Sequence, residues 1–390
     1  MIYLVYDRLT TGAEGSYDPR VSQPEAKQRV VNAWQSLDLW LRGLGAWAPV
    51  AVVGVAGLAI TVEQALVRHQ SVARGDTLIY ERMASDPFGV HTFPFGFRIG
   101  VPWLVHVLPF SHQVSFELLA LLCIAVASGF LYSLMTYLET PPSVALLLCV
   151  SFAISPGLLI VLIRNGYNVD AATLLVMIAA ALFTVRKQFA LLCLTLALGA
   201  FVREATIFMI PFAYAIWAEG WFDTRALKRT ALVALPAVAI YIALRLGIQT
   251  VGEEQVIGYG SDLIAGRLDV IDVGLTDWDR SLRRVALAFG PLWLLLPFAL
   301  KRMKYAQRGV VLLALLLISM TFALDWGRIA LLAAPVVYPA AGFVLLNKQR
   351  WRIPVIALWI AISVGYAVYM TSHGVAANVD GGGIPTYPVR

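Results

Sequence analysis

Four arginines lie beside apolar segments of this chain, and three of them have an acid close by in the sequence. The arginines are Arg98, Arg164, Arg203 and Arg328, and the acids are Asp170, Glu204 and Asp325. A charge next to an apolar helix is costly, so it is usually paired or functional. The planar guanidinium group fits phosphate oxygens, so several arginines at one membrane depth could hold a lipid phosphate. In the alternative interpretation, the arginines pair with Asp170, Glu204 and Asp325 and only join helix ends.

A second candidate is the carboxylate of Asp76, near the start of the segment GDTLIYERMA. Tyr80 and Ala84 follow it at intervals of four residues, which places all three on one face of a helix. A carboxylate at the start of such a helix stays ionised and can act as a general base. Aspartate is also a favoured N-cap residue, which is the structural alternative. Three further acids could be the base instead: Glu63, Glu81 and Asp86.

Histidine and cysteine form no recognisable metal-binding pattern in the sequence. His91, His106 and His112 are separated by 15 and 6 residues, which fits no helical ligand pair such as i and i+4. The three cysteines lie inside apolar runs and are interpreted as buried apolar side chains. No metal site is predicted. The chain also has neither a P-loop nor a Rossmann glycine fingerprint, which disfavours a nucleotide-sugar enzyme facing the cytoplasm.

The composition indicates that the elements which position these residues cross a membrane. The chain is 59% hydrophobic and 14% charged, whereas a soluble domain carries about 25% charged residues. Repeated apolar runs of about 15 to 25 residues predict an all-α polytopic membrane protein. About eleven transmembrane helices are expected, near residues 48–66, 113–137, 143–163, 170–185, 188–202, 206–218, 230–247, 285–300, 309–324, 328–346 and 353–371.

The chain is expected to have three parts. Residues 1–45 form a polar cytoplasmic segment, and residues 24–47 within and after it form an amphipathic helix at the membrane interface. Residues 46–371 form the helical membrane domain, and residues 372–390 form a flexible outer tail. Because the polar start does not fit a cleavable signal peptide, the first apolar run is expected to remain as a membrane anchor.

The positions of the lysines predict the orientation. If the chain breaks into two helices at Arg203–Glu204 and its N-terminus is cytoplasmic, all six lysines lie on the cytoplasmic side, as the positive-inside rule requires. A single long helix there would invert every later segment and place four lysines outside. The sequence therefore predicts a multi-pass plasma (inner) membrane protein with short helices in its first outer loop. The loops 67–112 and 248–284, the C-terminus and the active site are expected on the extracytoplasmic side.

Four short segments resemble motifs of the GT-C superfamily of integral membrane glycosyltransferases. Asp76, Tyr80 and Ala84 match the superfamily's Asp-Glu-x-x-Tyr-x-x-x-Ala pattern in the first outer loop, but Thr77 stands where a second acid is common. The other segments are FPFGFRIGVPWL at 93–104, FVREATIFMIPFA at 201–213 and DWGRIALLAAPVVYP at 325–339. They are similar to its Pro-Phe-x-Tyr-Arg, Arg-Glu-Thr and Asp-x-x-Arg segments. The resemblance covers most of the chain in layout but only these segments in residues.

The resemblance implies transfer of a hexose or pentose from a polyprenyl-phosphate donor to a glycan, lipid or protein acceptor. Asp76 would take the proton of the acceptor hydroxyl as general base. The implied substrate-binding residues are Tyr80, Arg98, Arg164, Arg203, Glu204 and Arg328, and the arginines among them would neutralise the departing phosphate. The partners are these two substrates and membrane lipids, with no nucleic acid. No cofactor is expected; some superfamily members use a divalent metal, but the sequence has no clear acid cluster for one.

Two other classes of protein are alternatives. A lipid or solute transporter also has charges and broken helices within the membrane. Its charges tend to lie near the midplane of inverted repeats, however, and no two halves of this chain match. A non-catalytic GT-C-like subunit of a larger membrane complex would tolerate the loss of Asp76, whereas an enzyme would not.

Overall fold

The computed structural model describes seven stretches of the chain, residues 23–67, 76–159, 167–220, 222–251, 278–320, 326–347 and 349–369. The chain divides into two compact units, Met1–Leu44 and Gly45–Arg390. In the first unit, α2 (Gln23–Leu44) is the helix predicted over 24–47. It carries exposed apolar side chains, among them Leu39 and Trp40. Its position at a membrane surface stays a prediction.

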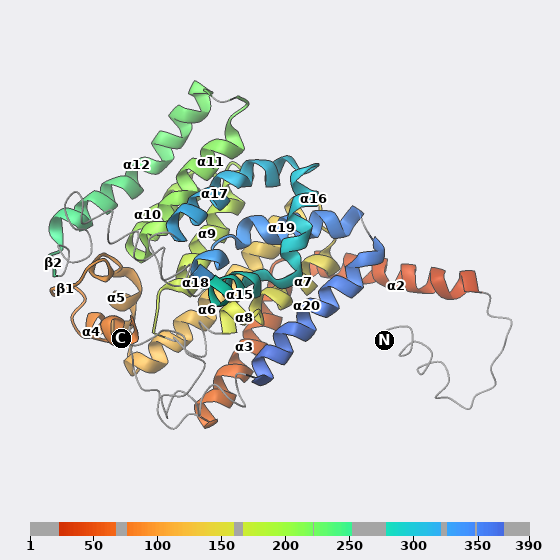
Figure 1. The fold of residues 1–390 in the computed structure, drawn as a ribbon, viewed down its shortest axis with the longest axis horizontal. Helices are drawn as coiled ribbons and strands as arrows, with labels where there is room; N and C mark the ends of the chain where they lie inside the picture. Colours follow the sequence, from red (N-terminus) through yellow and green to blue (C-terminus); the bar gives the residue numbers. More distant parts are fainter. Residues whose placement is uncertain are drawn as a thin grey trace. The chain divides into compact units, whose positions relative to one another are not determined.

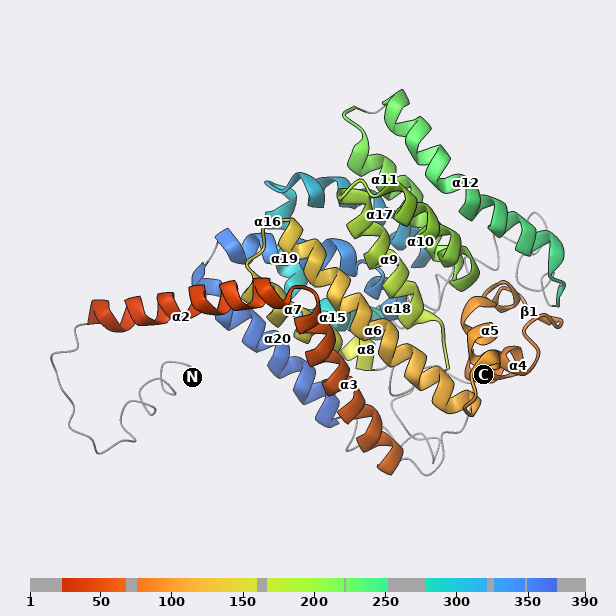
Figure 2. The ribbon, with the colours of Figure 1, turned by 180° about the vertical axis from the view of Figure 1, so that it is seen from behind.

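The second unit is built from helices (Figures 1 and 2). Its first half contains α3 (Trp47–Val67), α4 (Asp76–Ser85), η1 (Phe95–Phe97), α5 (Gly100–Val107), α6 (His112–Tyr137), α7 (Pro142–Ala153), α8 (Pro156–Leu159), α9 (Asp170–Val185) and α10 (Phe189–Val202). Its second half contains η3 (Glu204–Phe208), α11 (Met209–Trp217), α12 (Thr224–Gly247), α15 (Trp278–Phe289), η4 (Gly290–Leu295), α16 (Leu296–Leu300), α17 (Lys304–Met320), α18 (Trp326–Leu331), α19 (Ala334–Asn347) and α20 (Gln349–Tyr369). The long helix α6 packs against α3, α7 and α9, and α10 packs against α9 and α12.

Several of these helices are long and apolar enough to cross a membrane. Among the described residues, three helical stretches meet both criteria, namely His112–Tyr137, Thr224–Gly247 and Ser281–Leu300. A fourth is added if Gln35–Leu44 and Trp47–Gly57 form one bent span, and six further apolar helices have 10–17 residues. The chain is therefore a helical, multi-pass membrane protein. The described helices do not by themselves supply the eleven predicted spans.

Three of the predicted helices are interrupted, namely 143–163, 285–300 and 328–346. The first is divided between α7 and α8, the second passes through the 3-10 segment η4, and the third is divided between α18 and α19. A proline stands at the first or second position of the element after each interruption: Pro156, Pro291 and Pro335. Proline lacks an N–H group and restricts the residue before it, so it starts a helix more readily than it continues one.

The break predicted at Arg203–Glu204 is present. α10 ends at Val202, and the Arg203 backbone is extended, with φ −166° and ψ 142°. The 3-10 segment η3 begins at the next residue, and the Thr206 hydroxyl donates to the Arg203 carbonyl oxygen at 2.8 Å. The helix therefore stops just before two charged residues, Arg203 and Glu204.

A short pair of parallel strands is an exception to the all-α prediction. β1 (His91–Thr92) pairs with β2 (Thr250–Val251), and the Phe93 N–H donates to the Val251 carbonyl oxygen at 3.0 Å. The two strands belong to the predicted outer loops 67–112 and 248–284. The described parts of these two loops therefore lie side by side at this strand pair.

Two clusters of buried apolar side chains hold the second unit together. The larger cluster extends through most of the helices from α3 to α20. The smaller cluster lies between α4, η1, α5, the start of α6 and the end of α12, and includes Tyr80, Phe93, Phe97, Phe116 and Leu244. It supports the segment that carries Arg98.

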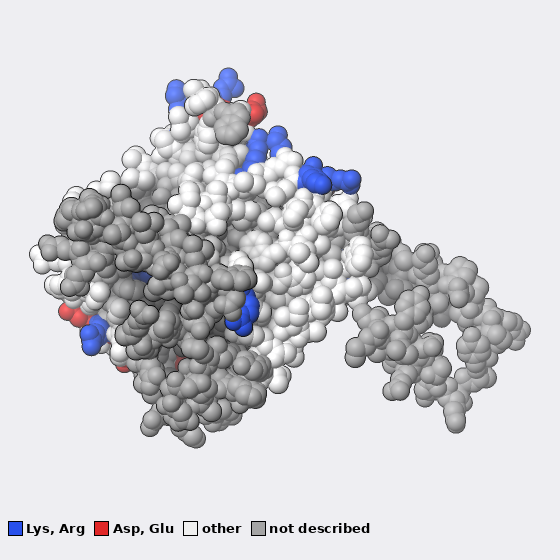
Figure 3. Space-filling view, in the orientation of Figure 1, with Lys and Arg blue, Asp and Glu red and all other residues white. Residues whose placement is uncertain are grey.

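Basic side chains gather at one end of the second unit, over the start of α12 and the link from α16 to α17 (Figure 3). The exposed basic residues of these two segments are Arg225, Lys228, Arg229, Lys301, Arg302 and Lys304. At 1.5 Å per residue, Lys228 lies roughly 25 Å along α12 from Arg245 in its last turn. The basic end and the strand pair therefore lie at opposite ends of α12. Which end faces the cytoplasm stays a prediction.

Candidate functional site

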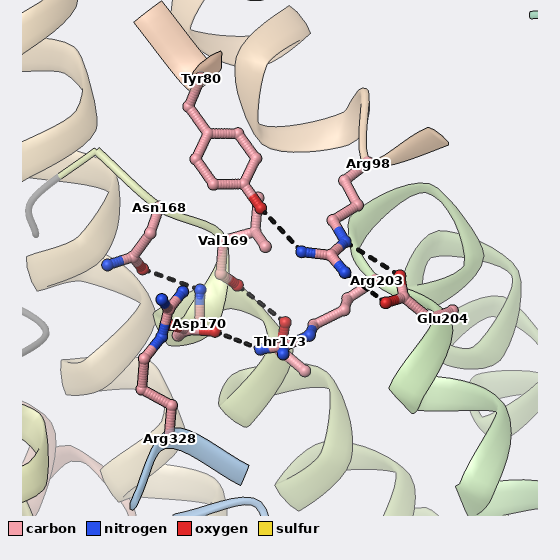
Figure 4. Close-up of polar contacts among 9 residues, drawn as sticks. All are labelled: Tyr80, Arg98, Asn168, Val169, Asp170, Thr173, Arg203, Glu204 and Arg328. Atoms are coloured by element: carbon pink, nitrogen blue, oxygen red, sulfur yellow. Dashed lines mark hydrogen bonds and ion pairs between the residues drawn. The ribbon is translucent and has the colours of Figure 1, made fainter. Parts of the chain in front are cut away.

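Asp170, the first residue of α9, is a buried carboxylate that binds two arginines (Figure 4). Its Oδ1 accepts from Nη1 of Arg203, and its Oδ2 accepts from Nε of Arg328. The Asp170 side chain is only 3% exposed. Its backbone N–H donates to Oδ1 of Asn168 at 2.9 Å, and this side-chain turn fixes the start of the helix. One carboxylate therefore holds two guanidinium groups that come from distant segments.

Arg98 forms a second ion pair beside the first. Its Nε donates to Oε2 of Glu204 at 3.0 Å, and its Nη2 donates to Oε1 of the same carboxylate. Such bidentate pairing fixes the orientation of the two groups as well as their separation. Arg98 Nη1 donates to the Tyr80 hydroxyl oxygen at 3.2 Å, and the guanidinium carbon lies 5.0 Å from the Phe95 ring centroid. The Arg98 side chain is 9% exposed and the Glu204 side chain 36%, so the carboxylate is the more exposed member of the pair.

Burial and charge together set the ionisation of Arg98 and Tyr80. Burial lowers the pKa of Arg98, but the charge and hydrogen bonds of Glu204 and Tyr80 together outweigh this effect and raise the pKa above its ordinary value. Burial also raises the pKa of Tyr80, and the positive charge of Arg98 offsets only part of that rise. At neutral pH Arg98 is therefore charged and Tyr80 is a neutral phenol, which keeps an O–H donor while its oxygen accepts from Arg98.

The ion pairs join segments that are far apart in the sequence. Arg98 and Glu204 are separated by 106 residues, Arg203 and Asp170 by 33, and Arg328 and Asp170 by 158. Arginines do pair with Asp170 and Glu204, as the alternative interpretation predicts, but Arg203 and its sequence neighbour Glu204 each bind a different partner. Neighbouring side chains at an extended residue point in different directions, and Arg203 has an extended backbone.

This network can bind an anion. Among the described residues, three guanidinium groups meet at two carboxylates. Nε of Arg203 is buried and has no hydrogen-bond partner among the described residues. A buried donor without a partner costs free energy. A phosphate oxygen would satisfy this donor through a charge-assisted hydrogen bond.

Most of the predicted site residues meet in this network, namely Tyr80, Arg98, Arg203, Glu204 and Arg328. Arg164 and Asp325 lie outside the described residues. Asp76 begins α4, as expected, one helical turn before Tyr80. Both Tyr80 and Ala84 on that face are buried. The Asp76 side chain lies outside what the structure describes, so its role as base stays a prediction.

The alternative bases have different surroundings. Glu81 is half-buried on α4, Asp86 is exposed just after that helix, and the side chain of Glu63 lies outside the described residues. Burial alone therefore does not show which of these acids could act as the general base.

Two of the three histidines in this region bind the backbone around the end of α4. Nε2 of His91 lies 2.7 Å from the Asp86 carbonyl oxygen, and Nδ1 of His106 lies 2.8 Å from that of Ala84. His112 is the first residue of α6. Within the described ranges, no three His, Cys, Asp or Glu side chains come together in a metal-binding group.

Asp170 was missed as a site residue, since the sequence suggested it only as a pairing partner. A signal was available, because it is the acid that follows the polar segment RNGYNV and begins the helix predicted at 170–185. An acid at a helix start can cap the helix, or it can pair with an arginine that binds a ligand. The sequence does not distinguish these two roles.

No protein-family model matches the chain, and no curated protein matches it. Among solved structures, the chain is similar to the crystal structure of an oligosaccharyltransferase from Archaeoglobus fulgidus in complex with Zn and sulfate. The TM-score is 0.46 and the sequence identity 14%. The similarity covers 80% of this chain and 51% of that one, so this chain spans about half the length of the archaeal protein.

Proposed function

We propose that this protein is a GT-C-type glycosyltransferase. It transfers a sugar from a polyprenyl-phosphate donor to an acceptor hydroxyl on the extracytoplasmic face of the membrane. The observation that carries the proposal is the meeting of Arg98, Arg203 and Arg328 at two acids, beside a buried Arg203 Nε that has no partner among the described residues. These arginines come from the segments 93–104, 201–213 and 325–339, which resemble GT-C motifs.

The donor phosphate is proposed to bind beside Arg203 and Arg328. Asp170 holds both guanidinium groups in fixed directions, and Nε of Arg203 offers an unused buried donor. Arg164 is included because it precedes Asp170 by six residues. Glu204 and Tyr80 hold Arg98, which adds a third positive charge near the phosphate. Fixed charges of this kind stabilise negative charge that develops during a reaction.

Asp76 is proposed as the general base. It stands four residues before Tyr80 on the same helical face, about 6 Å along the axis. Its carboxylate takes the proton of the acceptor hydroxyl while the acceptor oxygen bonds to C1 of the sugar. The bond from C1 to the phosphate oxygen breaks, and its electron pair leaves with the polyprenyl phosphate. The arginines stabilise the charge gained by that phosphate, and binding both substrates supplies their orientation.

The membrane arrangement is part of the same proposal. The chain would cross the plasma membrane about eleven times, with its N-terminus in the cytoplasm. The pairing of β1 with β2 and the basic cluster at the other end of α12 support this arrangement. The lipid tail of the donor would lie among the apolar helices.

The test is the release of polyprenyl phosphate by the purified protein in nanodiscs. The donors are a panel of polyprenyl-phosphate sugars, and the acceptors are envelope glycans. Asp76→Asn is expected to lower turnover by about 10² to 10⁴-fold, which is the usual contribution of a general base. Its binding of polyprenyl phosphate, measured separately, should match the wild type. Arg203→Met should instead weaken that binding.

Glu139→Gln is the control, because it removes an exposed acid just after α6, at the opposite end of that helix from Phe116 of the smaller cluster. It should leave turnover unchanged. Equal turnover by wild type and Asp76→Asn would move the base to Glu63, Glu81 or Asp86. Passage of labelled polyprenyl phosphate across a vesicle membrane without sugar release would indicate a transporter. Absence of both binding and turnover would favour a non-catalytic subunit.

A further inference from the structure

Arg245, in the last turn of α12, stacks on the aromatic loop that carries Arg98. Its guanidinium carbon lies 4.0 Å from the ring centroid of Phe97, 5.3 Å from that of Phe93 and 5.1 Å from that of Tyr241. A guanidinium group over an aromatic face within about 6 Å is attracted to the ring. Two of these contacts, to Phe93 and Phe97, reach the loop, whereas Tyr241 belongs to α12 itself, so Arg245 clamps the loop to α12.

The clamp is directly connected to Arg98 through the backbone. Phe97 is the last residue of η1, and Arg98 follows it at once. The Arg98 N–H donates to the Phe95 carbonyl oxygen at 2.8 Å, which closes the turn. The rings of Phe93 and Phe97 also meet edge to face, 6.1 Å apart. A shift of the Phe97 ring would therefore carry the backbone from which the Arg98 side chain extends.

The strand pair holds the same loop close to the end of α12. β1 and β2 join residues 91–92 to residues 250–251, which follow α12 after a short link. Gly96 lies so close to β2 that an added Cβ would come within 2.8 Å of the Thr250 Cγ2. Figure 1 shows β1, α4 and α5 grouped beside this end of α12. The loop is thus held at two places, by Arg245 to α12 and by the strand pair to the residues that follow α12.

We propose that Arg245 is a positioning residue that holds η1 so that Arg98 keeps its bidentate ion pair with Glu204. The role in sugar transfer rests on the proposed function, whereas the effect on η1 does not. Arginine suits this role because its planar group stacks on rings, and lysine replaces it poorly at a stacked site. Arg245 therefore acts through Arg98 and touches no reacting atom.

The first measurement is hydrogen exchange of the peptide that contains residues 93–99, in purified full-length protein. Arg245→Met should speed exchange of the Arg98 amide by about 10-fold or more, because an opened turn exposes it. Arg245→Lys should give a smaller increase. The matched control is Arg229→Met, which removes another α12 arginine from an aromatic ring, that of Phe189 at 5.9 Å. Unchanged exchange in Arg245→Met, or an equal increase in the control, overturns the proposal.

The second measurement is a double-mutant cycle on sugar transfer with Arg98→Lys. Arg245→Met alone should lower kcat/KM about 10-fold, as expected for a misplaced binding group. In the Arg98→Lys background it should cause little further loss, since residues that act through one another are not additive. Independent, multiplying losses would overturn the positioning role. If the wild type transfers no sugar but the exchange result holds, the clamp stands and the proposed function fails.

Discussion

At Asp170 two guanidinium groups share one carboxylate whose side chain is 3% exposed. Such a group is costly to bury, and the cost is offset only while its partners stay in place. The converse also holds, because Arg203 and Arg328, whose side chains are 12% and 11% exposed, depend on its charge. The geometry of the proposed phosphate site therefore depends on a residue that would not itself touch the phosphate.

Asp170→Asn keeps the shape of the side chain but removes the charge. The free energy of unfolding is expected to fall by about 3 kcal/mol, because two buried arginines lose their counter-charge. Thermal unfolding in detergent, followed by circular dichroism, measures the change. Glu139→Gln is the control, since that acid is exposed. A matching stability for the two variants would show that solvent or lipid already compensates these arginines.

Among the elements, α5 and α10 set the distance between two of the arginines. A Cβ added to Gly100, the first residue of α5, would lie 3.0 Å from the Phe201 carbonyl oxygen and 3.1 Å from its Cβ. Gly100 is two residues after Arg98, and Phe201 is two residues before Arg203. This close approach therefore brings both arginine-bearing segments to the same place.

Gly100→Ala is expected to push α5 away from α10 and to cost about 1 to 3 kcal/mol, as overpacking commonly does. The backbone oxygen that it meets cannot move without disturbing the end of α10. Urea unfolding in detergent and binding of polyprenyl phosphate should both be impaired. Gly365→Ala in α20 is the control, because a Cβ there meets nothing within 4 Å. That variant should be neutral or slightly stabilised, since alanine favours helix; equal losses would contradict the packing argument.

Some features of the helices could be predicted from the sequence, and others could not. The helix over 170–185 was predicted with the bounds of α9, and the break at Arg203 followed from the lysine distribution. The interruptions before Pro156 and Pro335 were missed, because apolar runs conceal a proline that starts a new helix. The partner of Glu204 could not be predicted either. Its pairing with Arg98 depends on packing between segments 106 residues apart, and the local spacing of residues does not reveal such packing.

In the whole molecule, the predicted outer segments converge even though the number of spans is not established. Arg98, Asp170, Glu204 and Arg328 come from four separate parts of the sequence and meet in one network. The strand pair adds the loop that follows α12 to the same region. Residues that touch must lie at the same membrane depth, so the convergence constrains the topology independently of any count of helices.

This constraint can be tested by labelling single cysteines in intact cells with a membrane-impermeant maleimide. Ser85→Cys and Gln249→Cys lie at exposed positions near β1 and β2, and Lys228→Cys and Lys304→Cys lie at the basic end. Each would be made in a chain whose three native cysteines are replaced by alanine. We expect the first two to react from outside and the lysine positions only after permeabilisation, as the positive-inside rule requires. The reverse pattern would place the arginine network in the cytoplasm and exclude an extracytoplasmic donor site. Opposite results for Ser85→Cys and Gln249→Cys would contradict the strand pairing itself.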